Sequence, residues 1–328
     1  MRALVLTHQN GFGGLTADDL PAPEPDKGQV SIDVKYAGVG LIDAFWVSGV
    51  IPSNAGFVPG LEVSGTVRAL GGGVTGFAVG QKVAALLPGA GGFAEIACTP
   101  ATLVAAIPPG LSIDLASVIP INTVTAHLAL TTVSRFSPGE SLLIHAGVGG
   151  LGSQFAQVAR ALGAGRVDAV VGTSAKQGIA RELGYDQSYL RSELAAIQAD
   201  TYDVVIDPVG GAATETGFRV LRGGGRLVRV GNASQANDVA LSSMAHWLEN
   251  KTTAGFNVGG WLADRPGEGA ASLRWALEAV ARGDVRVDLT RVGGINEIPD
   301  LLAALERGDT TGKLAVRMAI DPLAEIVP

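Results

Sequence analysis

The chain has 328 residues, 47% hydrophobic and 17% charged, so it can bury a large core and is long enough for two domains of the usual ~100 to 200 residues. A net charge of −7 without a basic cluster argues against nucleic acid or an anionic membrane as the main partner. The single cysteine, Cys98, forms no internal disulfide, which favours the reducing cytoplasm, and we expect neither a leader peptide nor a membrane span.

The N-terminal third reads as short β-rich segments separated by glycine and proline turns. We interpret the glycine runs at 71–73 and 91–92 as hairpin turns. A series of short strands of this kind is typical of a partly open antiparallel barrel. The predicted strands are 29–36, 62–69, 81–87 and 93–98.

From Thr123 onwards, predicted helices and strands alternate, which is typical of a doubly wound parallel sheet covered by helices. The fold class is therefore α/β, with a change of organisation near residue 118. The predicted strands are 141–146, 167–172, 202–207, 226–231 and a last one near 314–318. The predicted helices are 151–162, 271–282 and 297–307.

A glycine run follows the apolar strand 141–146 and reads Gly147-Val148-Gly149-Gly150-Leu151-Gly152. Its G-x-G-x-x-G spacing lets backbone amides approach a pyrophosphate at the start of the next helix. The order strand, glycine turn, amphipathic helix, strand makes a βαβ unit, which favours dinucleotide binding. The alternative is a glycine turn with a purely structural role.

The end of the second strand of this unit indicates which dinucleotide binds. NAD-binding chains usually carry an acidic residue there, about 20 residues after the glycines. This chain instead reads Gly172-Thr173-Ser174-Ala175-Lys176, which offers a hydroxyl and an ammonium to a 2′-phosphate. We therefore predict NADPH. Alternatively, Ser174 caps the following helix and Lys176 is a solvated surface charge.

Short motifs over nearly the whole length carry a family resemblance. They are Gly38–Asp43 with Ser48-Gly49, Pro59–Gly65, Phe77–Val83, Gly92–Glu95, Thr125 within the segment NTVTAHLAL, His145–Gly152 and Gly312-Lys313. With them the chain resembles the medium-chain dehydrogenase/reductase superfamily, and within it the zinc-independent quinone oxidoreductases and their enone-reducing relatives. The resemblance implies a GroES-like catalytic domain at 1–118, a Rossmann NADPH-binding domain at 119–256, and a return to the catalytic domain at 257–328.

The resemblance also raises the question of zinc, which many members of the superfamily use. A catalytic zinc needs three protein ligands, commonly Cys and His. In the zinc enzymes they fall at the positions occupied here by Gly40, Leu61 and Ile121, whose side chains offer no ligand atom. We therefore predict no metal, and hydride delivery to an electron-poor acceptor such as a quinone or an α,β-unsaturated carbonyl.

By the same resemblance, several residues would contact the cofactor. Thr125 and the pair Gly231-Asn232 would lie along the nicotinamide ribose, and Phe256-Asn257 near the carboxamide. Lys313, together with Arg191, would reach the phosphates. Each also has an interpretation without function: Thr125 as a helix residue, the asparagines as turn formers and Lys313 as a surface charge.

No residue is assigned as a proton donor. Asp43 belongs to the superfamily pattern and is interpreted as structural, as are His127 and His145. The proton would come from solvent, or the product would leave as an enolate. Many of the similar quinone reductases carry a tyrosine and an asparagine where this chain has Phe45 and Gly40, which predicts a less polar acceptor pocket.

Large apolar side chains fit such a pocket as a wall, although they are equally consistent with plain core. They are Phe45, Trp46, Ile51 and Trp261. The predicted activity is thus NADPH-dependent, zinc-free reduction of a quinone or enone. An enoyl reductase acting on a thioester or biosynthetic intermediate, and a non-catalytic NADPH-binding sensor or scaffold, stay as alternatives. The resemblance further suggests a homodimer formed through the Rossmann sheet.

Overall fold

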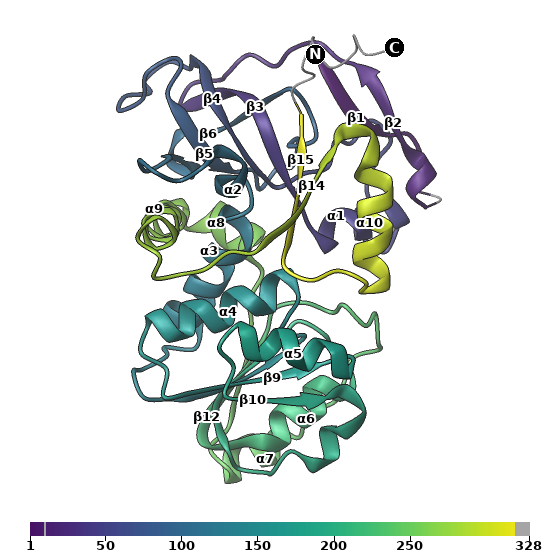
Figure 1. Cartoon of the computed structure of the whole chain (residues 1–328), viewed down its shortest axis with the longest axis vertical. Helices are drawn as coiled ribbons and strands as arrows, with labels where there is room; N and C mark the ends of the chain where they lie inside the picture. Colours follow the sequence, from purple (N-terminus) through teal and green to yellow (C-terminus); the bar gives the residue numbers. More distant parts are fainter. Residues whose placement is uncertain (10, 319–328) are drawn as a thin grey trace. The chain divides into compact units, whose positions relative to one another are not determined.

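Two large sheets organise the described chain, one in each of the two units into which it divides (Figure 1). The computed structural model describes residues 1–9 and 11–318. The first unit comprises Met1–Ile121, Leu262–Arg282 and the chain from Val287 onwards, and the second comprises Asn122–Trp261 and Gly283–Arg286. Among the described residues, no helix is both long enough and apolar enough to cross a membrane.

The sheet of the first unit has the order β14-β15-β3-β4-β5-β7, with β6 paired to β3. Its pairs are antiparallel except β14 with β15. The strands are β3 (Gln29–Val39), β4 (Glu62–Leu70), β5 (Lys82–Leu86), β6 (Ile96–Pro100), β7 (Val104–Ala106), β14 (Leu289–Gly294) and β15 (Lys313–Arg317), and a separate hairpin joins β1 (Arg2–Leu6) to β2 (Leu15–Asp19).

Valine and isoleucine fill much of the core of this unit because β-branched side chains suit a pleated surface that is buried on one face, and leucine fills the rest. Ile32, Val63 and Val83, from three neighbouring strands, are completely buried. Helices close the sheet: α1 (Leu41–Ser48), α2 (Ile113–Ala116), α9 (Pro266–Arg282) and α10 (Ile298–Arg307). The predicted strands at 29–36, 62–69, 81–87 and 93–98 correspond to β3 to β6 with small shifts at their ends.

The sheet of the second unit is parallel throughout, in the order β10-β9-β8-β11-β12-β13. Its strands are β8 (Ser141–His145), β9 (Arg166–Val171), β10 (Gln187–Leu190), β11 (Tyr202–Asp207), β12 (Leu221–Arg229) and β13 (Thr252–Gly255). This is the predicted doubly wound α/β class. The edge strands β10 and β13 escaped prediction because they are short and their side chains are at most half-buried.

Helices cover both faces of this sheet. Figure 1 shows α4 (Gly150–Ala161) and α5 (Ser174–Glu182) on one side and α6 (Ala212–Val220) with α7 (Ser243–Leu248) on the other. The remaining helices are α3 (Pro120–Leu128), which continues into a π-helical turn at Ala129–Val133, and α8 (Val258–Asp264). The strand order reverses between β8 and β11, and in such sheets ligands bind beyond the carboxyl ends of the strands at that reversal.

Candidate cofactor site

The turn between β8 and α4 lies at this reversal and contains the glycine run. Gly149 is the N-cap residue of α4, and no side chain caps the helix. The amides of the first helical turn therefore have no partner within the helix, and the first turn contains no acidic residue. Unpaired amides and the positive end of the helix dipole together attract an anion.

The glycines of the turn are required for different reasons. A Cβ on Gly147 would lie 2.7 Å from the Cβ of Ala169, and one on Gly152 would overlap the carbonyl oxygen of Ala146. These two glycines are needed by the protein's own packing. A Cβ on Gly149 would meet only the Ala146 carbonyl oxygen, at 3.3 Å, and φ is −72°. The fold therefore makes little demand for glycine at 149, which is consistent with space reserved for a ligand.

A tyrosine that sequence reasoning did not single out lies against this turn. The Tyr185 hydroxyl donates a hydrogen bond to the carbonyl of Gly147 at 2.7 Å and lies 3.0 Å from the carbonyl of Gly152. No sequence motif around Tyr185 predicts this contact. The one feature that could have indicated it is the residue type, an aromatic ring that can be buried while its hydroxyl forms a hydrogen bond.

Polar and cationic side chains gather where β9 ends. Thr173 caps α5, because its hydroxyl accepts from the amide of Lys176, so the alternative that Ser174 is the cap is wrong. Ser174 is instead the first helical residue and is exposed, and Lys176 is half-buried. Arg191, which follows β10, places its guanidinium 3.5 Å from where a Cβ of Gly172 would lie. Hydroxyl, ammonium and guanidinium groups thus come from this one end of the sheet.

The tips of β11 and β12 are joined by a dense set of hydrogen bonds. The Asp207 carboxylate accepts from the amides of Val209 and Gly210 at 2.8 and 2.9 Å. The Asn232 side chain lies so close to Gly210 that no Cβ fits there, and its amide donates to Ala236 at 3.0 Å. Asn232 therefore has a structural role in this loop. Gly231 and Asn232 are both exposed.

His145, the last residue of β8, is 1% exposed. Burial lowers its pKa to about 4. The guanidinium of Arg191 also lowers this pKa, whereas the carboxylate of Asp207 raises it. The imidazole is therefore neutral at physiological pH. Its Nε2 is buried and has no hydrogen-bond partner, and a neutral imidazole with a pKa near 4 is a poor proton donor at physiological pH.

The remaining predicted contacts of this unit lie on α3 and before α8. Thr125 is buried in α3, which is tied to α4 because the Thr123 hydroxyl donates to the Gln154 side chain at 2.9 Å. Phe256 is buried and makes an edge contact with Trp261, with ring centroids 5.5 Å apart. Asn257 accepts from the amide of Gly260 at 3.2 Å and so caps the first turn of α8.

Lys313 belongs to the first unit and has a different partner from the predicted phosphate. Its ammonium lies 2.6 Å from the Glu62 carboxylate, and both side chains are 3% exposed. The charge that made Lys313 a phosphate candidate is therefore neutralised inside the first unit. The alternative of a surface charge is wrong, because the side chain is buried, and the contact with a phosphate stays a prediction.

Asp43 has the structural role that its motif indicated. Its carboxylate accepts from the amides of Gly40 and Gly60, both at 2.9 Å. Burial raises its pKa to about 7, although these two amides lower it. Asp43 thus ties α1 to the loop that leads into β4. The apolar residues Phe45 and Trp46 on the same helix are used in packing: Phe45 is buried, and Trp46 contacts Phe57 edge-on with centroids 5.1 Å apart.

The residues present do not fit a zinc ion. Gly40, Leu61 and Ile121 carry no ligating side-chain atom, and the Cys98 thiol donates to the carbonyl of Pro23 at 3.6 Å. Across the described parts of the chain, no group of three His, Cys, Asp or Glu side chains could hold a metal ion. Residues 1–9 and 11–318 therefore do not bring together the donor set that zinc requires.

Family comparisons agree with this architecture. Residues 26–109 match the family described as the alcohol dehydrogenase GroES-like domain, and residues 150–278 match the family described as zinc-binding dehydrogenase. The chain belongs to the medium-chain dehydrogenase/reductase superfamily. Within this superfamily it is similar to the quinone oxidoreductases.

Three known proteins illustrate what this chain is similar to. A spectinabilin polyketide synthase system protein of Streptomyces orinoci is 30% identical over 96% of this chain, which spans only 15% of that protein's length. A mycobacterial protein solved in complex with NADPH is 25% identical, with a TM-score of 0.87 over 97% of this chain and 100% of its own. A mycobacterial quinone oxidoreductase is 26% identical, with a TM-score of 0.83 over 97% and 99%.

Proposed function

We propose that this medium-chain reductase is an NADPH-dependent, zinc-free oxidoreductase that delivers hydride to a quinone or an α,β-unsaturated carbonyl compound. The observation that carries the proposal is the glycine turn at 147–152. No side chain caps the start of α4 there, and the packing of the protein itself makes little demand for glycine at position 149. Pyrophosphate is the group that this arrangement fits. The similar mycobacterial protein that was solved with NADPH supports the same assignment.

The choice of NADPH over NADH rests on the end of β9. Ser174, Lys176 and Arg191 offer a hydroxyl and two cations, and the segment from Gly172 to Lys176 contains no carboxylate to bind a ribose 2′-hydroxyl. A phosphate gains charge-assisted hydrogen bonds from such groups. A 2′-phosphate is therefore favoured there.

Bound NADPH supplies the hydride, and the protein supplies binding and orientation. We propose that the amides of Val148 and of residues 150–152 hold the pyrophosphate and that residues of α3 and of two loops line the nicotinamide end. Those residues are Thr125, Gly231, Asn232, Phe256 and Asn257. Because His145 is buried and neutral, the proton that completes the reduction comes from solvent, or the product leaves as an enolate.

An enoyl reductase is the second candidate, because the similarity to the Streptomyces polyketide synthase protein extends over 96% of this chain. Reduction of an enoyl thioester is a step in polyketide assembly that a hydride donor of this kind could serve. A thioester is another electron-poor acceptor, so the cofactor site is the same for both candidates. They differ only in the acceptor.

NADPH consumption measured with benzoquinone, a simple enone and an enoyl thioester separates these functions. We expect turnover with the quinone or the enone, while turnover confined to the thioester would favour the enoyl reductase. Tight NADPH binding without consumption of any acceptor would indicate a sensor or scaffold. Zinc found in stoichiometric amount by elemental analysis, and lost together with activity, would overturn the zinc-free assignment.

We also propose a homodimer formed through the parallel sheet. Strand β13 ends that sheet and carries unpaired backbone groups on its outer side, within the part of the chain that the structure describes. The adjacent helix α7 exposes large apolar side chains: Met244 (54% exposed), Trp247 (71%) and Leu248 (65%). Exposed apolar groups beside an open strand edge favour association with a second copy. A cytoplasmic location stays a prediction.

A further inference from the structure

Tyr185 lies between α5 and β10, and its backbone is held on both sides. Its amide donates to the carbonyl of Ala180 at 3.1 Å. The next residue, Asp186, donates its amide to the Val167 carbonyl at 2.9 Å and accepts from the Val167 amide at 2.7 Å through its carboxylate. Tyr185 is therefore fixed to both α5 and β9, and only 6% of it is exposed.

From this position a single hydroxyl reaches both ends of the glycine turn. It donates to the Gly147 carbonyl at 2.7 Å and lies 3.0 Å from the carbonyl of Gly152, so the bond is shared between the residue that opens the turn and one in the first turn of α4. Burial raises the pKa of Tyr185, so the hydroxyl keeps its proton and stays a donor. The tyrosine thus braces the turn from its carbonyl side.

The turn needs such a restraint. Ala146 has φ +51°, a left-handed conformation that is unfavourable for a residue with a Cβ. Few backbone bonds hold the segment: the Gly147 amide donates to Val170 at 3.1 Å and the Gly149 amide to Ala146 at 3.0 Å. Amides that are to face an anion cannot also anchor the turn. Bonds to its carbonyls, such as those of Tyr185, leave the amides available.

Gly147 and Tyr185 are sterically matched. A Cβ at position 147 would lie 3.0 Å from the Tyr185 hydroxyl oxygen and 2.7 Å from the Ala169 Cβ. The glycine leaves the space that the phenol uses. The bracing contact is therefore built into the packing of the turn and does not depend on a flexible side chain.

We propose that Tyr185 is a positioning residue whose hydroxyl holds the glycine turn in its anion-binding conformation and thereby sets the affinity for NADPH. The inference rests on the proposed function for the identity of the ligand. Its physical basis is preorganisation: a turn ordered before binding loses less conformational freedom when the pyrophosphate arrives, and that saving appears as affinity. Tyr185 does not touch the reacting atoms, so it should leave the turnover number unchanged.

Tyr185→Phe removes only the hydroxyl and tests the role directly. We expect the Kd for NADPH, measured by isothermal titration calorimetry, to rise about three- to tenfold, in line with the loss of one buried hydrogen bond. At saturating NADPH, kcat should stay within about twofold of the unchanged protein, since chemistry is not affected. In the unliganded protein, hydrogen exchange of the Gly147 and Gly149 amides, whose backbone bonds anchor the turn, should become faster.

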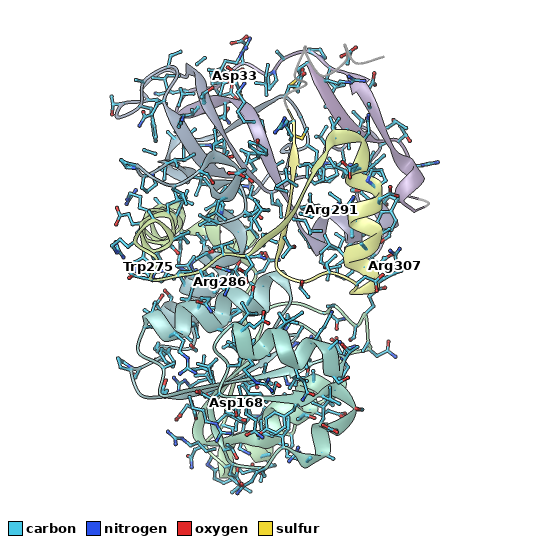
Figure 2. The ribbon with its side chains drawn as sticks, in the orientation of Figure 1. Asp33, Asp168, Trp275, Arg286, Arg291 and Arg307 are labelled. Carbon is cyan, nitrogen blue, oxygen red and sulfur yellow. The ribbon has the colours of Figure 1, made fainter. Side chains whose placement is uncertain are left out.

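Tyr202→Phe is the matched control, because it deletes another buried tyrosine hydroxyl from the same unit. That hydroxyl donates to the buried carboxylate of Asp168 on β9. Asp168 is labelled in Figure 2. Tyr202→Phe should lower the free energy of unfolding and leave the Kd for NADPH unchanged. An unchanged Kd in Tyr185→Phe, or equal changes in both variants, would overturn the inference while NADPH binding itself stood. If the unchanged protein bound no NADPH, both the proposed function and the inference would fail.

Discussion

The ammonium of Lys313 lies 2.6 Å from the carboxylate of Glu62, and both side chains are 3% exposed. The second Glu62 oxygen accepts from the amide of Ile121 at 2.8 Å, near the start of α3. Gly38 leaves room for this carboxylate, because a Cβ there would overlap it. The ion pair thus joins the last strand, β15, to β4 and to the N-terminus of α3 within the first unit.

Removing one partner of this pair should destabilise the protein strongly. Lys313→Met leaves Glu62 as a buried charge without a cation, which typically costs about 3–5 kcal/mol. The free energy of unfolding, measured in urea, reports the loss. Arg307→Met is the control, because Arg307 pairs with Asp309 at the surface, where both are about 60% exposed, and should change stability by under ~1 kcal/mol. Equal effects of the two variants would contradict a buried, obligatory pair.

Lys176→Glu should separate the two nicotinamide cofactors. Reversing the charge at the start of α5 repels a 2′-phosphate, so the KM for NADPH should rise roughly tenfold or more while that for NADH changes little. Steady-state kinetics with both cofactors measure this difference. Arg181→Glu makes the same charge change in the last turn of α5 and serves as the control. Parallel changes for NADPH and NADH would refute the phosphate assignment.

Gly149→Val should weaken NADPH binding and spare the fold. The backbone at 149 is extended, with φ −72° and ψ 168°, which valine adopts readily, and only one close contact meets a Cβ. Losing even one or two amide–phosphate bonds should raise the Kd at least ~30-fold. Circular dichroism and calorimetric titration together test this. Gly152→Val, where a Cβ overlaps the Ala146 carbonyl, should instead impair folding. Unchanged affinity in a folded Gly149→Val would place the nucleotide elsewhere.

His145 should make the protein less stable in mild acid. Its pKa is about 4 in the folded state, against about 6.5 when unfolded. The unfolded chain therefore binds the proton first, so this contribution is complete above pH ~6.5 and is lost as the pH falls towards 4. Between pH 7.5 and pH 5 the loss should be about 2 kcal/mol. Urea unfolding of His145→Gln should show a weaker pH dependence, whereas the exposed His8→Gln should behave like the unchanged protein.

Trp247→Glu should convert a dimer to a monomer. The indole is 71% exposed on α7, beside the open edge strand β13, and a carboxylate in an apolar contact between two copies would be costly. Light scattering coupled to gel filtration measures the mass directly. Val79→Glu changes another exposed apolar residue, 69% exposed in the first unit, and should leave the mass unaltered. A monomeric unchanged protein would exclude the proposed assembly.

The local sequence pattern was enough to predict the α/β architecture of the chain. The period of apolar residues in 141–162, with a glycine run between strand and helix, defines a βαβ unit without any distant contact, and the structure shows β8, the turn and α4 there. The absence of a carboxylate at 172–176 and of ligand atoms at Gly40, Leu61 and Ile121 is likewise read directly from residue identities. Chemistry that depends only on residue types at a fixed spacing can be predicted from the sequence.

Only the tertiary structure decided which polar groups meet. Glu62 and Lys313 are 251 residues apart in the chain, and Tyr185 is 38 residues from Gly147, so no periodicity relates them. Their pairing depends on where separate strands and helices pack. An unpaired charge or hydroxyl inside the protein costs free energy. Lys313 therefore forms an ion pair with Glu62, and the Tyr185 hydroxyl forms hydrogen bonds with the carbonyls of the turn. The sequence alone determined where the turn is, and the fold determined what holds it in shape.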